Sequence, residues 1–568
     1  MAQRKRNKLR KAGVILGVFL LVAAAAAVYF HVRTRVKPPD PGVSADVFPQ
    51  ADSVGPGFYR AGRNWLRKNQ YGNWEMYLEG AAFERGVVAG RLCRHLVEYQ
   101  EDAFIGQIRE MIPSDFYLRF LKYFIYWFNR DLDHYIPEEY RQEIYGISLS
   151  ASDRFGFIGT PYQRMLNYHS AHDIGHALQD YMLVGCTSFG VWGHRSKDST
   201  LLIGRNFDFY VGDDFAKNKI VCFVKPDRGH PFMMVTWAGM TGAVSGMNAE
   251  GLTVTINAAK SSIPGSARTP ISILAREILQ YASTLREARD IAGKRETFVS
   301  ESILVGSARD KHAIIIEKSP FRMGIVSSPA DFIVCANHFQ SAAFRNDPLN
   351  RRDMQENASV YRQHRLLEDI GNHAPLGPAE AATILRDRKG LNEADIGMGN
   401  EKAMNQLIAH HSVIFQPENR LAWVSSAPWQ EGPYMCYDLR KIFRTFAVLL
   451  PDREIAEQER AIPPDPFLGT EDYRRFLQFR TWKKELRHHL RTGEPAAPRG
   501  GFTPDRFRDT NPRFYEVYEL LGDFYSGRKD WGKAAEAYGQ ALRLVIPRWQ
   551  EKRNIARKLV DCREKIRP

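Results

Sequence analysis

The spacing of apolar residues divides most of the chain into a helical block followed by a β-rich block. Between residues 73 and 185, segments such as AAFERGVVAGRLCRHLVEYQEDAF and DFYLRFLKYFIYWFNRDL carry apolar residues every three to four positions, which predicts amphipathic helices. From residue 186 onward the chain contains short β-branched and aromatic runs, such as TSFGVWG, TLLIGRNFDFY, KIVCFVKP and GLTVTINA. Gly, Asp and Pro separate these runs, and this pattern predicts strands.

Helical patterns return twice within the β-rich block. TPISILAREILQYASTLREARDIAG and ENASVYRQHRLLEDIGNH have helical spacing, and the runs SILVGSA, KHAIIIEKS and FIVCANHF lie between them. A last pair of strands is predicted in HSVIFQPENRLAWVSS. Strand blocks that alternate with helix blocks predict an α+β fold in which helices cover the sheets.

The N-terminus carries a separate apolar segment. Residues 12–30 contain no charged residue, and this length is sufficient to cross a bilayer. Six Lys and Arg residues precede the segment and three follow it within seven residues, so we expect the N-terminus to remain in the cytoplasm. A cleaved signal peptide is the alternative, because the alanine run at 23–27 offers small-residue cleavage sites. In either case the rest of the chain is expected outside the cytoplasm, which in a Gram-negative cell means the periplasm.

The net charge of +14 is concentrated at the two ends of the chain. Residues 1–37 carry nine Lys and Arg and no acidic residue, and residues 471–568 carry 23 Lys and Arg against 14 Asp and Glu. The region between them is close to neutral, which argues against a basic groove for nucleic acid in the main body. A membrane surface near the ends is the simpler partner.

The sequence contains no pattern typical of a cofactor site. It lacks GxSxG, GxxxxGK[ST] and GxGxxG motifs, and its six cysteines have no CxxC or zinc-like spacing. His169, His172 and His176 would share one face of a helix, so a metal site is geometrically possible. Because the cluster lies just before Cys186, we favour a structural or site-lining role, and we expect neither a metal nor a cofactor.

Cys186 lies in the motif GCTS, at the start of the β-rich block. The runs SFGVWG and TLLIGRNFDF form a predicted hairpin, whose return strand brings Arg205 and Asp208 back towards the cysteine. A nearby cation lowers the pKa of a thiol, and a nearby carboxylate could orient an ammonium group. Residues 205 and 208 have an odd separation, so both reach one site only if the strand twists or ends near Phe207.

Several motifs together resemble the cysteine branch of the N-terminal-nucleophile hydrolases. The chain is most similar to the penicillin acyltransferase type, and more distantly to choloylglycine hydrolase and acid ceramidase. The resemblance rests on LEGAAFERGVVAG, GCTS, GRNFDF, MNAEGLTVTINAA, VCANHF and HSVIFQPENRLAWVS, in that order along residues 79–426. It implies a four-layer αββα core without a metal or cofactor. Arg362 and Arg365 resemble a downstream Ser/Arg region of the family, but their alignment is ambiguous, so they are left outside the predicted catalytic set.

The resemblance also implies a mechanism. Cys186 would cleave the Gly185–Cys186 peptide bond and then act as an N-terminal nucleophile that forms a thioester. Its new α-amine, with a pKa of about 7.7–8.0, could serve as the general base. Arg205 and Asp208 would line the nucleophile, and Asn257 and Asn337 would stabilise the oxyanion. The expected substrate is a small-molecule or lipid-like compound with an acyl group in a non-peptide amide bond.

The resemblance and the composition together suggest six regions. We expect a basic tail and anchor at 1–37, a Pro/Gly-rich linker at 38–72, a helical pro-segment at 73–185, and the catalytic domain at 186–470. A second linker is predicted at 471–510 and a helical module at 511–568. The module resembles a single tetratricopeptide repeat, through Gly522, Tyr525, Trp531, Ala534, Ala535, Tyr538 and Ala541. One repeat cannot bury its own apolar face, so it should pack on the body, on the last helix or on a protein partner.

Three alternatives remain open at the level of the sequence. The enzyme could transfer acyl groups to an amine or alcohol rather than hydrolyse them. It could instead be a cysteine protease, in which His338, His410 or His411 would pair with Cys186. It could also be an inactive scaffold that binds a protein partner through residues 511–568.

Overall fold

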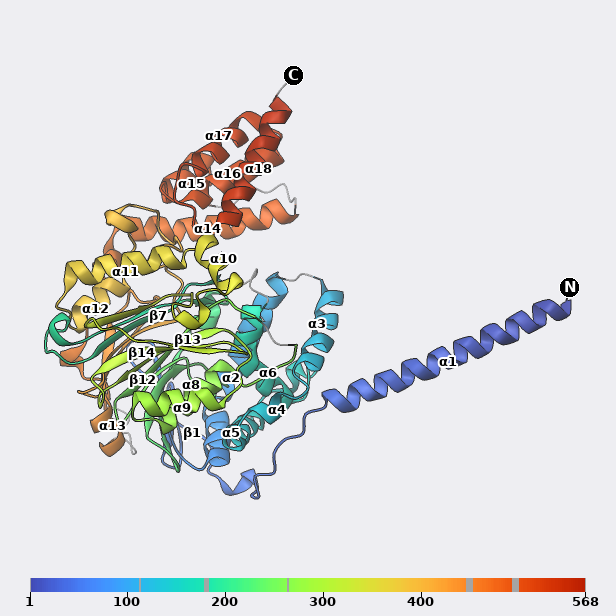
Figure 1. Ribbon diagram of the computed structural model, residues 1–568, viewed down its shortest axis with the longest axis horizontal. Helices are drawn as coiled ribbons and strands as arrows, with labels where there is room; N and C mark the ends of the chain where they lie inside the picture. The colour runs from blue at the N-terminus through green and yellow to red at the C-terminus, as the bar shows by residue number, and fades with distance from the viewer. Residues whose placement is uncertain are drawn as a thin grey trace.

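Two stacked β-sheets with helices on their outer faces form the body of the protein (Figure 1). The computed structural model describes residues 2–111, 114–177, 183–262, 265–445, 453–492 and 500–566. The order of layers is helices, large sheet, small sheet, helices, which confirms the predicted αββα arrangement.

The large sheet contains eleven strands. In spatial order they are β1 (Asp52–Gly55), β2 (Phe58–Ala61), β3 (Asn64–Lys68), β4 (Trp74–Gly80), β9 (Ile220–Pro226), β10 (Phe232–Thr236), β11 (Ser245–Asn248), β12 (Leu252–Ala258), β13 (Glu301–Ser307), β14 (His312–Lys318) and β15 (Met323–Val326). Strands β4 and β9 pair in parallel, from Trp74 opposite Ile220 to Gly80 opposite Pro226, and the other described pairings in this sheet are antiparallel. The β4–β9 pair joins the strands that precede Cys186 to the strands that follow it.

The small sheet contains six antiparallel strands and carries the segment that begins with Cys186. In spatial order they are β16 (Phe332–Cys335), β6 (Thr187–Val191), β7 (Leu202–Phe207), β17 (His411–Gln416), β18 (Leu421–Ser425) and β19 (Tyr434–Asp438). The predicted hairpins β6–β7 and β17–β18 are both present. A separate two-stranded ribbon pairs β5 (Leu183–Val184) with β8 (Phe209–Tyr210).

Three apolar clusters fill the three interfaces between the four layers. Strand β9 shows how one sequence serves two of them: Val221 and Phe223 face the small sheet, whereas Cys222 and Val224 face the helices. Because side chains alternate along a strand, a strand that is covered on both faces must be apolar at successive positions. The cluster beyond the small sheet joins its outer face to the helices on that side. The site described below lies at one end of the inter-sheet layer.

The helices fall into three groups. The N-terminal helices are α1 (Ala2–Thr34), α2 (Ala82–Met111), α3 (Asp115–Phe128), α4 (Leu132–Tyr135), α5 (Glu138–Ser148) and α6 (Pro161–Ala177). The helices within the β-rich block are α7 (Asp213–Ala216), α8 (Ile271–Tyr281), α9 (Leu285–Lys294), α10 (Pro348–Glu356), α11 (Ser359–His373), α12 (Pro378–Leu385) and α13 (Leu439–Thr445). The C-terminal helices are α14 (Glu471–Thr492), α15 (Pro504–Thr510), α16 (Tyr515–Gly527), α17 (Trp531–Ala541) and α18 (Trp549–Ile566). Helices α2, α8 and α9 contact the large sheet, and α11 and α12 contact the small sheet.

The prediction of a linker at 38–72 is wrong for residues 52–68. These residues form β1, β2 and β3 at the edge of the large sheet, with Phe58, Trp65 and Leu66 buried. The Pro- and Gly-rich composition dominated the sequence interpretation, but here Gly57 and Gly62 serve tight turns between short strands, each with a positive φ. The segment before Cys186 is therefore part of the sheet as well as helical.

The prediction of a linker at 471–510 is also wrong for residues 471–492 and 504–510, which are helical. Residues 471–492 form the long helix α14, whose Phe476, Phe479 and Trp482 are buried against the last helices. Helices α16 and α17 pack so closely at Gly522 that a Cβ atom there would lie 2.3 Å from the Tyr538 ring. The module contacts the main body, where Asn511 accepts a hydrogen bond from the Met398 amide at 3.1 Å. The tetratricopeptide resemblance itself stays a prediction.

Helix α1 projects away from the body, and α3 lies beside the end of α1 that enters it (Figure 1). Residues 10–34 form one helix that is long and apolar enough to cross a membrane, with a mean hydropathy of 2.5 over its most apolar window. Length and composition alone fit both an anchor and a signal sequence.

Candidate active site

Cys186 lies between β5 and β6, at the point where the chain enters the small sheet. Its side chain is 1 % exposed, and its Sγ lies 3.9 Å from Nη2 of Arg205 and 3.9 Å from the backbone oxygen of Asp208. The register of the β6–β7 hairpin, in which Ser188 is opposite Arg205, produces this proximity. The structure therefore brings together the cysteine and the two charged residues that the sequence placed beside it.

The position of Arg205 follows from alternation along β7. Leu201 and Ile203 face the large sheet, so Arg205 points the same way into the inter-sheet layer. Its Nη2 donates to the backbone oxygen of Ile256 at 2.5 Å, and its guanidinium lies 4.2 Å from the centre of the Phe207 ring. Burial lowers the pKa of Arg205, and the nearby Cys186 and Asp208 oppose that shift.

Asp208 reaches the site because β7 ends at Phe207. In a continuous strand, Asp208 would point to the face opposite Arg205. Because β7 ends before Asp208, both residues can reach the same site. The side chain is fully buried, and neither carboxylate oxygen has a hydrogen-bond partner among the described residues. Burial raises the pKa of Asp208 to about 7, although Arg362 and Arg205 favour its charged form. Such a buried carboxylate can still accept hydrogen bonds at both oxygens, and leaving them unpaired costs free energy.

Arg362 and Gln406 contact the Gly185–Cys186 bond and were not in the predicted site. Nη1 of Arg362 donates to the backbone oxygens of Gly185 at 2.7 Å and Cys186 at 2.8 Å. Nε2 of Gln406 donates to the same Gly185 oxygen at 2.8 Å. The carbonyl of the Gly185–Cys186 bond thus receives two side-chain donors. Arg362 had a weak family signal, whereas Gln406 lies in a loop with no motif that could have identified it.

Gly185 is required by the close approach of Gln406. A Cβ atom at position 185 would lie 2.2 Å from Nε2 of Gln406, so a side chain there would displace the amide. Gly185 does not have a positive φ, so backbone freedom is not the reason for a glycine here. Its role here is to leave space for a hydrogen-bond donor.

The two predicted oxyanion residues lie in different sheets and cross-link them: Asn257 is near the end of β12 in the large sheet, and Asn337 follows β16 in the small sheet. Nδ2 of Asn257 donates to the backbone oxygen of Cys335 at 3.2 Å, and Nδ2 of Asn337 donates to that of Ala258 at 3.0 Å. Oδ1 of Asn257 accepts from the Ser188 hydroxyl at 3.0 Å. Each amide group retains a second N–H, and the oxyanion role of both residues stays a prediction.

Asn337 also contacts the Arg362 guanidinium, which binds the Gly185–Cys186 peptide bond. Its Oδ1 accepts from Nη2 of Arg362 at 2.7 Å, and the other terminal nitrogen of that guanidinium binds Gly185 and Cys186. Arg365, the other arginine of the ambiguous region, instead pairs with Asp369, Asp387 and Glu393. Of these two arginines, Arg362 is therefore the one that contacts the candidate bond.

The electrostatic effect on the Cys186 thiol is opposite to the one expected. The sequence argument was that Arg205 would lower the pKa of the thiol, but burial outweighs that attraction and raises it to about 11. With Gly185 and Cys186 still joined, the thiol is therefore protonated at neutral pH. Proton removal must accompany any attack by the sulfur.

The histidines near the site make other contacts. Nε2 of His411 lies 2.8 Å from Oγ of Ser245, and Nδ1 of His338 lies 2.7 Å from Oγ of Ser359. Nδ1 of His410 lies 2.8 Å from Nδ1 of His411. Burial lowers the pKa of His338 to about 4 and that of His410 to about 3, so both rings are neutral. This arrangement does not favour a cysteine–histidine pair.

Both ring nitrogens of His169, the first member of the predicted histidine cluster, contact backbone atoms. Nδ1 lies 2.7 Å from the Met165 oxygen, and Nε2 accepts from the Thr241 amide at 2.8 Å. The side chains of His172 and His176 lie outside the described residues. Within the part of the chain that the structure describes, no group of three His, Cys, Asp or Glu side chains is arranged to hold a metal ion.

Comparison with known proteins supports the predicted relationship. Residues 194–428 match the family model described as acyl-coenzyme A:6-aminopenicillanic acid acyl-transferase. The match includes Arg205, Asp208, Asn257 and Asn337 and begins eight positions after Cys186. Over these residues, the predicted resemblance to the penicillin acyltransferase type is borne out.

Similarity to individual proteins is low. An uncharacterized protein of Archaeoglobus fulgidus is 24% identical over 317 residues, covering 49% of this chain and 52% of that protein, so the chain spans about half of the relative's length. A Caenorhabditis elegans N-acylethanolamine-hydrolyzing acid amidase ortholog has a TM-score of 0.31 at 16% identity, covering 41% of this chain and 93% of its own. A mutant of conjugated bile acid hydrolase from Clostridium perfringens has a TM-score of 0.28 at 12% identity, with 45% and 93% covered.

The raised pKa of Asp208 predicts how this residue affects stability at different pH values. Its pKa rises from an ordinary 3.8 to about 7 on folding, so the folded chain binds an extra proton between these values and loses stability as the pH rises through this window. In a Cys186→Ala background, which keeps the chain whole, Asp208→Asn resembles the neutral carboxyl and should therefore raise the free energy of unfolding at pH 8 by about 2–4 kcal/mol. The gain should disappear near pH 4.

Denaturant unfolding at pH 4, 6 and 8 measures this effect. Asp290→Asn, which changes an exposed carboxylate on α9, is the matched control and should change stability little at each pH. An Asp208→Asn variant that is destabilised more at pH 8 than at pH 4 would contradict the prediction, because it would mean that the attraction of Arg205 and Arg362 for the charged carboxylate outweighs its burial.

Proposed function

We propose that this chain is a self-processing amide hydrolase or acyltransferase that uses Cys186 as its nucleophile. One observation carries the proposal: the carbonyl of Gly185, next to the Cys186 thiol, is bound by Arg362 at 2.7 Å and Gln406 at 2.8 Å. A peptide carbonyl that accepts from a cation and an amide is polarised towards attack, and the same donors would stabilise the oxyanion that attack creates.

Self-processing would begin with attack of the Cys186 sulfur on the Gly185 carbonyl carbon. A carbon–sulfur bond forms, the carbon–nitrogen bond breaks, and the thiol proton passes to the departing nitrogen, which leaves a thioester and a free α-amine on Cys186. We assign the relay of this proton to Asp208, because the pKa of its carboxyl is about 7 and its oxygens have no partner among the described residues. Water then hydrolyses the thioester to give the Gly185 carboxylate and the free thiol.

The processed site would catalyse the same chemistry on an external amide. The α-amine of Cys186 acts as general base, and the Asp208 carboxylate accepts a hydrogen bond from the ammonium form. Asn257 and Asn337 stabilise the oxyanion with their remaining N–H groups. The substrate acyl group is held as a thioester on Cys186 until water, or an amine or alcohol acceptor, releases it.

Hydrolysis and transfer share every step up to the thioester, so both belong to the proposal. The scaffold alternative gains no support from the last helices. Their apolar residues form one cluster with α14 and with Leu407 of the body, which is the arrangement of a packed C-terminal cap.

Membrane attachment through α1 forms the second part of the proposal. The side chains of α1 from Val14 to Val28 are exposed, and the next turn packs on α3: the Phe30 ring lies 6.0 Å from the Trp127 ring and 5.8 Å from that of Tyr123. The same face of α3 continues towards the start of the helix with two exposed aromatic residues, Phe116 at 84 % and Phe120 at 62 %. Aromatic residues of this kind collect at the boundary between lipid and water.

Self-processing predicts two fragments, residues 1–185 and 186–568. A denaturing gel and intact mass should find both in the wild-type protein and a single chain in Cys186→Ala. Gln406→Leu removes one donor from the Gly185 carbonyl and should slow splitting by about 10²–10³-fold. Gln416→Leu, at a glutamine bound instead to Asp198, is the matched control and should split at the normal rate. A wild-type chain that stays whole yet turns over substrate would refute self-processing.

Amidase or transferase activity is tested with a panel of N-acyl amides, in water and with added amine acceptors. Cys186→Ala should lower turnover at least about 10³-fold, because the nucleophile is lost. Asn337→Leu should lower it by about 10²-fold through the loss of one oxyanion donor. Cys93→Ala, at a buried cysteine beside Met76, is the control and should remain active. If Cys186→Ala were as active as the wild type, the catalytic proposal would fail.

Anchoring by α1 predicts that the full chain stays with the membrane fraction during an alkaline wash. Placing Arg at both Val18 and Leu21 should release it, since each charge in a span costs about 2.5–3.5 kcal/mol. Val54→Arg, on the exposed edge strand β1, should have no effect. N-terminal sequencing decides between an anchor and a signal peptide, because a mature protein that starts within or after the alanine run at 23–27 would exclude the anchor.

A further inference from the structure

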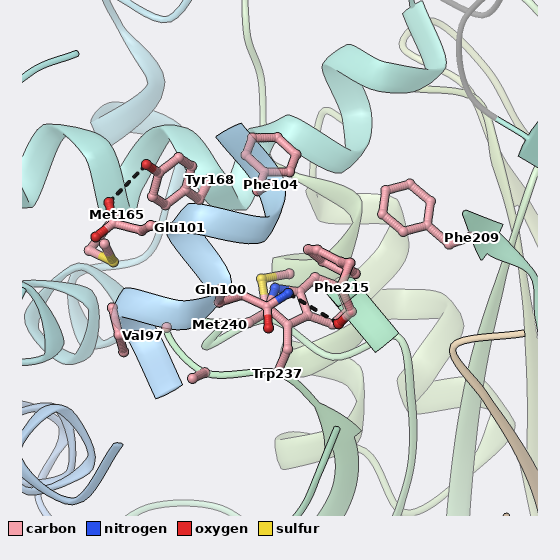
Figure 2. A pocket seen from close by; sticks show the side chains of 12 residues that line it. Val97, Gln100, Glu101, Phe104, Met165, Tyr168, Phe209, Phe215, Trp237 and Met240 are labelled. Carbon is pink, nitrogen blue, oxygen red and sulfur yellow. Dashed lines mark hydrogen bonds between the residues drawn. The ribbon is translucent and has the colours of Figure 1, made fainter. Parts of the chain in front are cut away.

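A pocket lies between the helices that precede Cys186 and the segments that follow it (Figure 2). The pocket is open to solvent on one side, and its enclosed part is small, about 40 Å³. The lining residues are Val97, Gln100, Glu101 and Phe104 from α2, Met165 and Tyr168 from α6, and Phe209, Phe215, Trp237, Ala238, Gly239 and Met240 from the β-rich block. Most of this surface is aromatic or aliphatic.

The pocket connects to the nucleophile through stacked aromatic rings. The Arg205 guanidinium, 3.9 Å from the Cys186 sulfur, lies over the Phe207 ring. Phe207 stacks on Phe209 at 5.6 Å and on Trp237 at 6.5 Å, and these two rings line the pocket. Cys186 and Phe207 belong to the same apolar cluster as the pocket residues Phe209 and Phe215, so apolar side chains link the sulfur to the pocket lining.

Two buried oxygen acceptors interrupt the apolar lining. Gln100 is 6 % exposed and its Nε2 donates to the Phe215 backbone oxygen at 3.3 Å, whereas its Oε1 has no partner among the described residues. Figure 2 shows Gln100 among Phe215, Trp237 and Met240, at the centre of the drawn group. An unpartnered buried acceptor is costly, and a ligand hydroxyl would satisfy it.

Glu101 supplies the second acceptor. It is 3 % exposed, and its Oε1 accepts from Nε of Arg164 at 2.9 Å and from the Tyr168 hydroxyl at 2.8 Å, while its Oε2 has no partner among the described residues. Since Arg164 already balances the charge of Glu101, the pocket has no net negative charge to attract an ammonium group. A carboxylate ligand would face two acceptors. The lining therefore fits an uncharged hydrogen-bond donor.

We propose that this pocket binds the acyl part of the substrate, and that this acyl group is apolar and carries a hydroxyl group that donates to Gln100. The inference rests on the proposed function, because it assigns the substrate class of the same Cys186 site. Helices α2 and α6 belong to the fragment that precedes Cys186, so both fragments build the pocket. The N-terminal fragment is then part of substrate selection.

The test compares N-acyl amides that share one amine and differ only in the acyl chain: unsubstituted, hydroxylated, or aminated at the same carbon. Wild-type protein should prefer the hydroxylated chain over the unsubstituted one by about 5–30-fold in kcat/KM, as one additional hydrogen bond would give. A preference for the aminated chain, or equal rates for the hydroxylated and unsubstituted chains, would overturn the inference without any need for a variant.

Gln100→Met keeps the shape of the side chain and removes the acceptor. It should abolish the preference for the hydroxylated chain and leave the unsubstituted chain unchanged. Gln107→Met, two turns further along α2 and outside the pocket lining, is the matched control and should keep the wild-type preference. Equal losses on all substrates in Gln100→Met would contradict a specific role for its oxygen.

Calorimetric titration of full-length Cys186→Ala with the hydroxylated amide separates this inference from the proposed function. Binding that Gln100→Met weakens in this background, together with no turnover by the wild type, would retain the pocket and reject the catalytic proposal. Turnover by the wild type without an effect of the hydroxyl group would retain the catalytic proposal and reject the pocket. Neither binding nor turnover would reject both.

Discussion

The guanidinium of Arg362 joins three parts of the chain that are far apart in sequence. From α11, on the outer face of the small sheet, it donates to the carbonyls of Gly185 and Cys186, to the Thr187 hydroxyl and to the side chain of Asn337. The side chain is 2 % exposed, so leaving any of these donors unused would be costly. Its geometry fixes the entrance to β6, and with it the positions of the thiol and of its neighbours.

Much of the site followed from local pattern. Alternation along β7 places Arg205 inside, and the end of that strand at Phe207 allows Asp208 to reach the same region. Arg362 and Gln406 could not be assigned in this way, because their roles depend on which backbone oxygen they meet across the fold. The sign of the thiol's pKa shift was equally out of reach. A neighbouring cation can be seen in a sequence, whereas the burial that outweighs it cannot.

The fold was predictable where elements are long and periodic, and less so where they are short. The layer order followed from the alternation of strand and helix blocks, but β1–β3 have four to five residues each in a region rich in Gly and Pro. Their turns carry the composition of a linker, and their stability comes from pairing with β4 and from burial of Trp65. Tertiary context decides such strands, and local propensity does not.

The parallel seam between β4 and β9 has a consequence for a chain cut at position 185. The strands and helices before the cut would stay in place through seven paired positions of main chain and through the apolar cluster that they share with the helices and strands after it. Attachment to a bilayer would then pass through a seam of hydrogen bonds instead of a covalent chain. The catalytic part would have no permanent tether of its own, and its residence at the membrane would last only as long as that seam resists fraying.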